Sequence, residues 1–277
     1  MSKLDIKKIE SLSDLIALKA DYFAASNGPL DGMWHFGFVA MATHFGFYED
    51  DTLIGYLCIN DEGYILQFHL AQEAKIDKRD LFKLIAQGNS QVIGTLKGAF
   101  VSTAESDYLS LCLDNSVGFK VNALMYQALK SRPIATEIGL SLSLASADQL
   151  SEFVDFAASN IGAPKAWLTG YYENLINRNE LLGYWEKGEL LACGECRFFD
   201  DYQTEYADLG VIVAQAERGE GLATRVLAWL SMHADEKGLK AICSTESTNV
   251  PAQKAISRAG FATSNRIVQF DFERFDS

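Results

Sequence analysis

The stretch that decides the fold is ADLGVIVAQAERGEGLAT, at residues 207–224. Its first seven residues are a short apolar run with β-branched side chains, which predicts a buried strand. A helical pattern begins at Leu222, with apolar residues three and four positions apart, and Gly238 is a typical stop signal for it. A strand, a glycine-containing turn and a helix in this order are suited to binding an anion. Glycines let the backbone approach a ligand, and the first helical N–H groups favour negative charge.

Three interpretations of this turn compete. The first is a purely structural turn, because two glycines alone are weak evidence of a site. The second is a dinucleotide-binding turn, with Glu246 at a suitable distance for an acid that binds ribose. That fingerprint, however, places its first glycine almost directly after the strand and has a third glycine where this chain has Thr224.

The third interpretation is a resemblance to the pyrophosphate loop of the GNAT acyl-CoA N-acyltransferases. The signature of that loop is Gln/Arg-x-x-Gly-x-Gly/Ala, and Arg218, Gly221 and Ala223 fill it. Val213 stands where the family ends its fourth strand. A second motif follows a predicted strand over 240–246: the run NVPAQKAISRAGF, starting at Asn249, resembles the family's Asn-x-x-Ala helix closed by Gly-Phe. The resemblance covers roughly residues 141–272.

The resemblance implies acetyl-CoA as the cosubstrate, held by the end of the strand, the loop and the following motif. Arg218 would add a cation that can pair with phosphate. Backbone N–H groups near the strand end would meet the oxyanion of the tetrahedral intermediate. The implied cofactor-binding residues are Val211, Ile212, Val213, Arg218, Gly219, Glu220, Gly221, Leu222, Ala223, Thr224 and Asn249.

An attacking amine must lose a proton, because an alkylamine with a pKa of about 10.4 is almost wholly protonated at neutral pH. A carboxylate can take that proton, directly or through water. In related enzymes this carboxylate often lies on the fourth strand, where Asp208 matches best and Glu205 is second. The alternative for Asp208 is a structural carboxylate held by a neighbouring amide or cation.

The position of the family's usual general acid, a tyrosine on the last helix, corresponds to Ile256. A thiol with a pKa of about 8.5 can leave as its anion, and losing general acid catalysis costs about 10²–10⁴-fold in rate. Ser257, Cys243 and Tyr172 are alternative acids, among which the sequence does not choose. We predict an acetyl-CoA-dependent N-acetyltransferase acting on a primary amine of a small molecule, an amino acid or a peptide. The alternative is a non-catalytic acyl-CoA-binding sensor or interaction module.

The order of elements is repeated along the chain. Ser102-Thr103 precedes Gly118-Phe119 by the same 16 residues that separate Ser244-Thr245 from Gly260-Phe261. We therefore expect an α/β (α+β) fold of two tandem GNAT-like domains, each a mixed central sheet flanked by helices. The expected domains are residues 1–132 and 133–277, joined near Lys130 to Ile134.

The first half has no glycine between its strand and its helix, where the run from Lys75 to Arg79 stands. A Cβ at each of these positions would keep a pyrophosphate away from the backbone amides. The first half is therefore expected to lack a cofactor site, and one chain to bind one acetyl-CoA. Trp34, His35 and Phe36 are candidates for lining one side of the acceptor cleft.

Composition narrows the possible partners and location. Lys and Arg number 24 against 37 Asp and Glu, and the formal net charge of −13 argues against nucleic acid as a partner. The first residues do not read as a signal peptide, and no apolar run is long enough to span a membrane. Five scattered cysteines predict reduced thiols in the cytoplasm. Cys193 and Cys196 have the spacing of a metal knuckle or a redox pair, but nothing completes a zinc set, so no metal is expected. The oligomeric state is not predicted.

Overall fold

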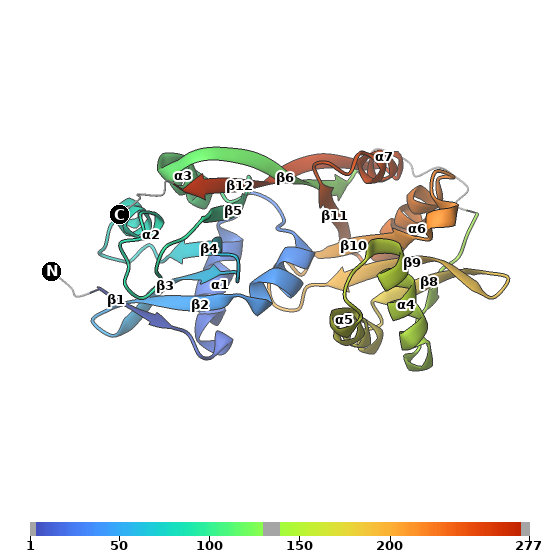
Figure 1. The fold of residues 1–277 in the computed structure, drawn as a ribbon, viewed down its shortest axis with the longest axis horizontal. Helices are drawn as coiled ribbons and strands as arrows, with labels where there is room; N and C mark the ends of the chain where they lie inside the picture. The colour runs from blue at the N-terminus through green and yellow to red at the C-terminus, as the bar shows by residue number, and fades with distance from the viewer. Residues whose placement is uncertain (1–3, 130–138, 273–277) are drawn as a thin grey trace. The chain divides into compact units, whose positions relative to one another are not determined.

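A computed structural model describes residues 4–129 and 139–272 of the chain (Figure 1). The chain separates into two compact units. Unit 1 consists of Met1–Leu124 with Asn265–Ser277, and unit 2 of Met125–Ser264. The expected joint near Lys130 to Ile134, with the boundary between residues 132 and 133, lies outside the described residues.

Unit 1 is a mixed sheet with helices on its faces. Its strand order is β1-β2-β3-β4-β5-β12, in which β4 and β5 run parallel. The elements are β1 (Leu4–Lys8), η1 (Leu12–Leu15), α1 (Ile16–Ala24), η2 (Trp34–Val39), β2 (Thr43–Glu49), β3 (Thr52–Ile59), β4 (Tyr64–Leu70), α2 (Lys78–Ala86), β5 (Gly98–Ser102), α3 (Ser106–Asn115) and the first part of β6 (Ser116–Ala128).

Unit 2 repeats this order with a sheet β7-β8-β9-β10-β11-β6, in which β10 and β11 run parallel. Its elements are β7 (Ser143–Leu144), η3 (Ala147–Gln149), α4 (Leu150–Ile161), α5 (Lys165–Asn177), β8 (Leu181–Glu186), β9 (Glu189–Phe198), β10 (Tyr206–Val213), η4 (Gln215–Glu217), α6 (Leu222–Glu236), β11 (Lys240–Glu246), α7 (Val250–Arg258) and the first part of β12 (Phe261–Phe272). Two tandem units, each with mixed parallel and antiparallel strands flanked by helices, confirm the expected fold class.

The last strand, β12, belongs partly to unit 1, although it lies in the second half of the sequence. Its residues from Asn265 onward belong to unit 1, where Ile267 to Asp271 pair antiparallel with β5. The two strands approach so closely that a Cβ at Gly98 would lie 1.8 Å from the carbonyl oxygen of Phe270. Glycine at this position is therefore required by a strand from the far end of the chain.

Unit 2 buries apolar side chains on both faces of its sheet. Helix α6 packs on one face of β9 and β10, and a Cβ at Gly194 would meet the Leu230 side chain of α6 at 3.2 Å. Helices α4 and α5 cover the other face, where Phe153, Tyr172 and Cys193 are buried together (Figure 1). Each strand therefore presents alternate residues to α6 and to the α4–α5 pair.

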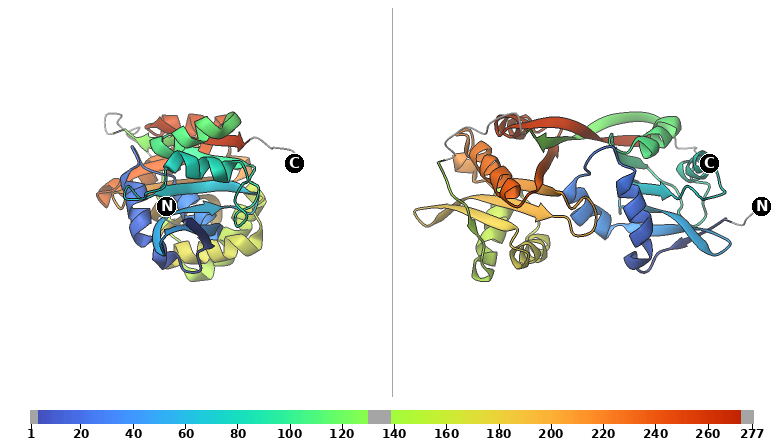
Figure 2. Two further views of the ribbon diagram at one scale, coloured as in Figure 1. Left: turned by 90° about the vertical axis from the view of Figure 1, so that its left-hand side faces the viewer. Right: turned by 180° about the vertical axis from the view of Figure 1, so that it is seen from behind.

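Helix α1 packs on one face of the unit 1 sheet, against β3 and β4 (Figure 2). This face of the sheet carries a polar layer. The strand registers place His44 opposite Cys58, and Cys58 opposite Gln67, so these three side chains share one face. Burial lowers the pKa of His44 to about 4, and nearby Lys19 adds to this effect. Because the folded state favours neutral His44, its contribution to stability is present above pH 6.5 and is lost as the pH falls towards 4.

Glu105, just before α3, has the opposite effect on stability. Burial raises the pKa of this carboxyl to about 7, although Tyr22 and the backbone N–H of Ser102 both donate to it. Folding therefore favours the protonated carboxyl. Its contribution to stability is present below the ordinary value of 4.5 and is lost as the pH rises through 7.

Glu105→Gln is expected to raise the melting temperature more at pH 8 than at pH 5, because the variant has no buried charge to form. The difference between the two pKa values of Glu105 corresponds to about 3 kcal/mol. Thermal unfolding of both proteins from pH 5 to pH 8 measures the effect. Parallel melting curves across this range would show that Glu105 does not titrate in the folded chain.

Candidate active site

The predicted loop forms at the end of β10 and leads directly into α6. Gly219 and Gly221 have φ values of 94° and 77°, the left-handed region that glycine adopts without strain. A Cβ built at either position meets no atom within 4 Å, so the space over the loop is open. Gly221 is the N-cap of α6, whose first N–H groups have no partner inside the helix. The loop therefore offers backbone donors to open space, as an anion site requires.

Arg218 supports the shape of this loop. Its Nε donates to the carbonyl oxygen of Val213 at 3.3 Å, and its Nη2 to that of Asn160, near the end of α4, at 2.8 Å. The Asn160 side chain in turn accepts from the backbone N–H of Gln215 at 2.8 Å. The guanidinium is thus held in place beside the glycines, and donors that these bonds do not use are left for a ligand.

Strands β10 and β11 diverge beside the loop. Their parallel register runs from Tyr206↔Lys240 to Asp208↔Ile242. Beyond this point, among the residues that the structure describes, β10 continues to Val213 without pairing with β11. The edge of β10 over 209–213, which includes predicted Val211, Ile212 and Val213, therefore has backbone groups that β11 does not use.

The second predicted motif lies on α7. Asn249 is its exposed N-cap, and its side chain accepts from the backbone N–H of Ala252 at 3.2 Å. Thr224 of α6 donates its hydroxyl to the carbonyl oxygen of Ala255 at 3.4 Å, which joins the helix of the loop to α7. The structural role of Asn249 is therefore that of a helix cap.

The candidates for the general acid lie in different surroundings. Ile256, at the position of the family's tyrosine, is 4% exposed. Cys243 and Tyr172 are buried, and burial raises the pKa of Tyr172 well above its usual range. Ser257 is exposed on α7. Of these four side chains, only that of Ser257 is freely accessible to solvent.

The corresponding loop of unit 1 is satisfied by the protein's own carboxylates. Glu49, which is buried, accepts from the backbone N–H groups of Lys75 at 3.2 Å and Ile76 at 2.8 Å. Asp77 caps α2 by accepting from the N–H groups of Arg79 and Asp80. Glu186, at the matching position of the β8–β9 hairpin, is exposed. The loop of unit 1 therefore has fewer backbone N–H groups available to bind a phosphate than the loop of unit 2.

Aromatic side chains fill the space next to β4 in unit 1. Phe68, Phe82 and Tyr108 are buried in contact with one another, with ring centroids 5.0 to 6.3 Å apart. The Tyr108 hydroxyl donates to the carbonyl oxygen of Ile65 at 3.1 Å. These rings occupy volume on the face of the sheet that α2 and α3 cover.

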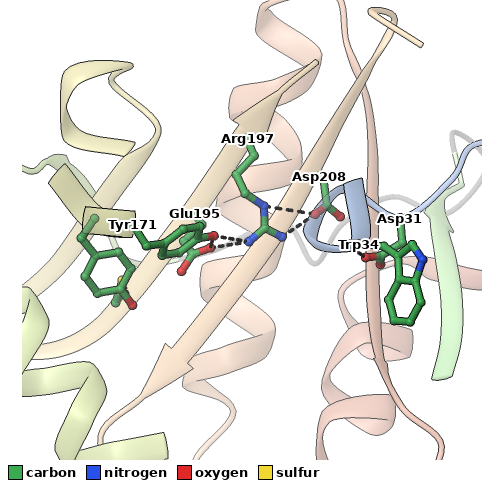
Figure 3. Close-up of polar contacts among 8 residues, drawn as sticks. Asp31, Trp34, Tyr171, Glu195, Arg197 and Asp208 are labelled. Carbon is green, nitrogen blue, oxygen red and sulfur yellow. Dashed lines mark hydrogen bonds and ion pairs between the residues drawn. The ribbon is translucent and has the colours of Figure 1, made fainter. Parts of the chain in front are cut away.

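Asp208 belongs to a buried group of four polar side chains, which we name the Arg197 cluster (Figure 3). The Arg197 guanidinium lies between Asp208 and Glu195. Its Nε donates to Asp208 Oδ2 at 3.1 Å, and its Nη2 donates to the same oxygen. Its Nη1 donates to Glu195 Oε2. Tyr171 of α5 donates to Glu195 Oε2 at 2.7 Å and accepts from Arg197 at 2.8 Å. Burial alone would lower the pKa of Arg197, but its acidic neighbours more than offset this.

The predicted carboxylates therefore have contrasting environments. Asp208 is 1% exposed and ion-paired. Glu205 is exposed just before β10, at the end of that strand far from the loop. Glu195 was not among the predicted site residues, because the segment from Cys193 to Cys196 was interpreted by its spacing as a metal knuckle or a redox pair. Glu195 is identified from the register of β9 and β10, which places it opposite Gly210.

Trp34, His35 and Phe36 lie on η2 of unit 1. The Trp34 backbone N–H donates to Asp31 at 2.7 Å (Figure 3). The Trp34 ring packs with its centroid 5.2 Å from that of Phe100. A role for these residues in binding the acceptor stays a prediction. Within residues 4–129 and 139–272, no group of three or more potential metal ligands occurs, and no helix has the length and apolar character of a membrane span.

Family models match both halves of the chain: a model described as acetyltransferase (GNAT) domain over residues 11–129, and one described as acetyltransferase (GNAT) family over 150–261. A solved acetyltransferase of the GNAT family from Colwellia psychrerythraea is 60% identical, with a TM-score of 0.92 over 97% of this chain and 100% of its own. The chain belongs to the GNAT acetyltransferase family. This confirms the resemblance in both halves, and it implies acyl-CoA-dependent acetyl transfer.

More distant structures share the fold. A GCN5-related N-acetyltransferase from Sphaerobacter thermophilus is 11% identical, with a TM-score of 0.65 over 99% of this chain and 98% of its own. A tandem GNAT protein from the clavulanic acid biosynthesis pathway is 12% identical, with a TM-score of 0.62 over 96% and 98%. A comparison with curated proteins gives no match. The tandem arrangement therefore occurs in a protein of very different sequence.

Proposed function

We propose that unit 2 transfers the acetyl group of acetyl-CoA to a primary amine of a small molecule, an amino acid or a peptide. The observation that carries this proposal is the open glycine loop at the N-terminus of α6, beside the point where β10 and β11 diverge. The loop supplies backbone N–H groups that can bind a pyrophosphate. The edge of β10 that does not pair with β11 supplies backbone N–H groups that can bind the oxygen of a thioester.

Each part of the site has a role in this reaction. The backbone of Gly219 to Thr224 and the Arg218 guanidinium hold the pyrophosphate. Backbone N–H groups over 211–213 stabilise negative charge on the thioester oxygen as the amine attacks. Acetyl-CoA supplies an activated acyl group whose thiolate leaves readily. Asp208 and Glu205 are the carboxylates that the sequence proposes as bases.

The first unit has a supporting role in this proposal. Glu49 and Asp77 already accept from the backbone donors of its loop, so we expect no pyrophosphate there. All five cysteines are buried free thiols, which supports a reducing compartment such as the cytoplasm. We expect no nucleic-acid partner, because the net charge is −13.

A second candidate function is that of a non-catalytic acyl-CoA-binding sensor or interaction module. The observation that favours it is Ile256, an apolar buried residue at the position of the usual general acid. The two functions agree on cofactor binding and differ in turnover.

The test is a thiol-release assay with acetyl-CoA over a panel of primary amines, amino acids and peptides, together with calorimetry. We expect turnover with at least one amine and one acetyl-CoA bound per chain. Binding without turnover over the whole panel would favour the sensor. Two equivalent acetyl-CoA sites per chain would contradict the division between the two units.

A further inference from the structure

Glu195 has one oxygen fixed and one oxygen available. Tyr171 and Arg197 both donate to Glu195 Oε2. Among the described residues, no other group forms a hydrogen bond with this side chain. Oε1 accepts no hydrogen bond from the described residues. The side chain is nevertheless largely buried, with 7% of the residue exposed. A carboxylate held this firmly, with one oxygen open, is suited to receiving a ligand.

The position of Glu195 in the sheet places it next to the proposed acyl site. Its register partner on β10 is Gly210, two residues beyond Asp208, where the pairing of β10 with β11 ends. A Cβ at position 210 would lie 3.0 Å from Glu195 Oε2, so a glycine here makes room for the carboxylate. Glu195 lies on the β9 side of β10, so its carboxylate is over Gly210, one strand away from the edge that β11 leaves unpaired.

The charge of the Arg197 cluster favours a cationic ligand. Two carboxylates, Glu195 and Asp208, face one guanidinium, which leaves one negative charge in a buried setting. Tyr171 does not change this balance, because burial and the neighbouring Glu195 raise its pKa well above the usual range and it stays a neutral donor. Buried charge is costly unless it is paired. An ammonium group at Oε1 would complete the pairing.

We propose that Glu195 is the carboxylate that binds the acceptor ammonium and takes its proton, and that Tyr171 and Arg197 position it. This inference rests on the proposed acetyl transfer. The ammonium gives one proton to Oε1, and the neutral amine nitrogen then attacks the thioester carbon to form the C–N bond. As the C–S bond breaks, the second nitrogen proton goes to the leaving thiolate. Glu195 releases its proton to solvent. The products are the amide, free CoA and one proton.

Asp208 and Glu205 fit this role less well. Asp208 is 1% exposed and Arg197 donates twice to its Oδ2, so it is less accessible to an amine than Glu195, which is 7% exposed. Glu205 is at the other end of β10. Among these three carboxylates, Glu195 combines an oxygen that accepts no hydrogen bond from the described residues with a position over Gly210.

The test compares Glu195→Gln with a matched control, Glu180→Gln, in the full chain. Glu180 is 2% exposed and pairs with Arg178 at 2.8 Å in the same unit, so both variants remove the charge of a buried carboxylate that is paired with an arginine. The probe is acetyl-CoA with the panel of amines. We expect Glu195→Gln to lower turnover at pH 7 at least about 10²-fold, with acetyl-CoA affinity within about twofold. Glu180→Gln is expected to keep turnover within about twofold, even where its melting temperature falls.

The pH profile separates proton transfer from a structural effect. In Glu195→Gln, residual turnover should rise about tenfold per pH unit between pH 7 and pH 9, following the neutral fraction of the amine. The groups facing Glu195 are Arg197 and Cys193 on β9, Asp208 on β10, and Tyr171 and Tyr172 on α5. The pKa values of the cysteine and both tyrosines are raised well above their usual values, and that of Arg197 is raised too.

Tyr171→Phe tests positioning, since it removes one of the two donors to Oε2 and leaves the carboxylate. We expect a smaller loss of turnover than in Glu195→Gln, with the pH profile of the wild type. Either of two results would overturn the assignment of Glu195 but not the proposed acetyl transfer. One is wild-type turnover in folded Glu195→Gln. The other is an equal loss of turnover in Glu195→Gln and Glu180→Gln, with unchanged pH profiles. A wild-type chain that turns over no amine would overturn the proposed function as well.

Discussion

Replacing Gly221 by valine is expected to abolish the stabilisation of the chain by acetyl-CoA. Gly221 has a φ of 77°, where a β-branched residue is strained, so the loop must change shape to accept valine. The new side chain also enters the open space over the donors of α6. A ligand at 100 times its dissociation constant stabilises a protein by about 2.7 kcal/mol. Thermal unfolding with and without acetyl-CoA measures the loss.

Gly238→Val is the matched control for this variant. Gly238 follows the other end of the same helix, with a φ of 76° and no atom within 4 Å of a built Cβ. The backbone strain is therefore similar, but no donor of the loop is affected. We expect Gly238→Val to melt at a lower temperature and to keep the full acetyl-CoA shift. An equal shift in the Gly221 and Gly238 variants would contradict the loop as the cofactor site.

Arg197→Met is expected to be strongly destabilising, because it leaves Asp208 and Glu195 buried without their cation. Breaking a buried ion pair from one side costs about 3–5 kcal/mol. Without Arg197, each carboxylate loses the cation that it faces, and two like charges stay close together in a buried setting. Urea unfolding of both proteins at pH 7 and pH 5 measures this effect.

Arg178→Met provides the comparison for Arg197→Met. The Arg178 side chain is 30% exposed, although it also pairs with two carboxylates, Glu180 and Asp200. Because water partly screens these pairs, we expect a smaller destabilisation than for Arg197→Met. Equal stability of the wild type and Arg197→Met at pH 7 would show that the cluster is not held as a buried charged group.

The sequence by itself determined the elements of the fold and the place of the loop. The strand over 206–213, the helix from Leu222 and the stop at Gly238 follow from local periodicity and glycine conformation, which depend on neighbours along the chain. The capping box that Ser146 and Gln149 form at the start of η3 is likewise a local feature, because its two residues are only three positions apart. The repeat of elements in two halves is visible for the same reason.

Only the tertiary structure decided which groups meet. That β12 completes the sheet of unit 1 through β5 depends on pairing between segments far apart in the sequence, and no local pattern encodes the partner of a strand. Register across β9 and β10 likewise pairs Asp208 with Arg197 and puts Glu195 opposite Gly210. The sequence shows carboxylates on strands. Whether one is held by a cation or has an oxygen open to a substrate depends on what packs beside it, and only the folded chain determines that.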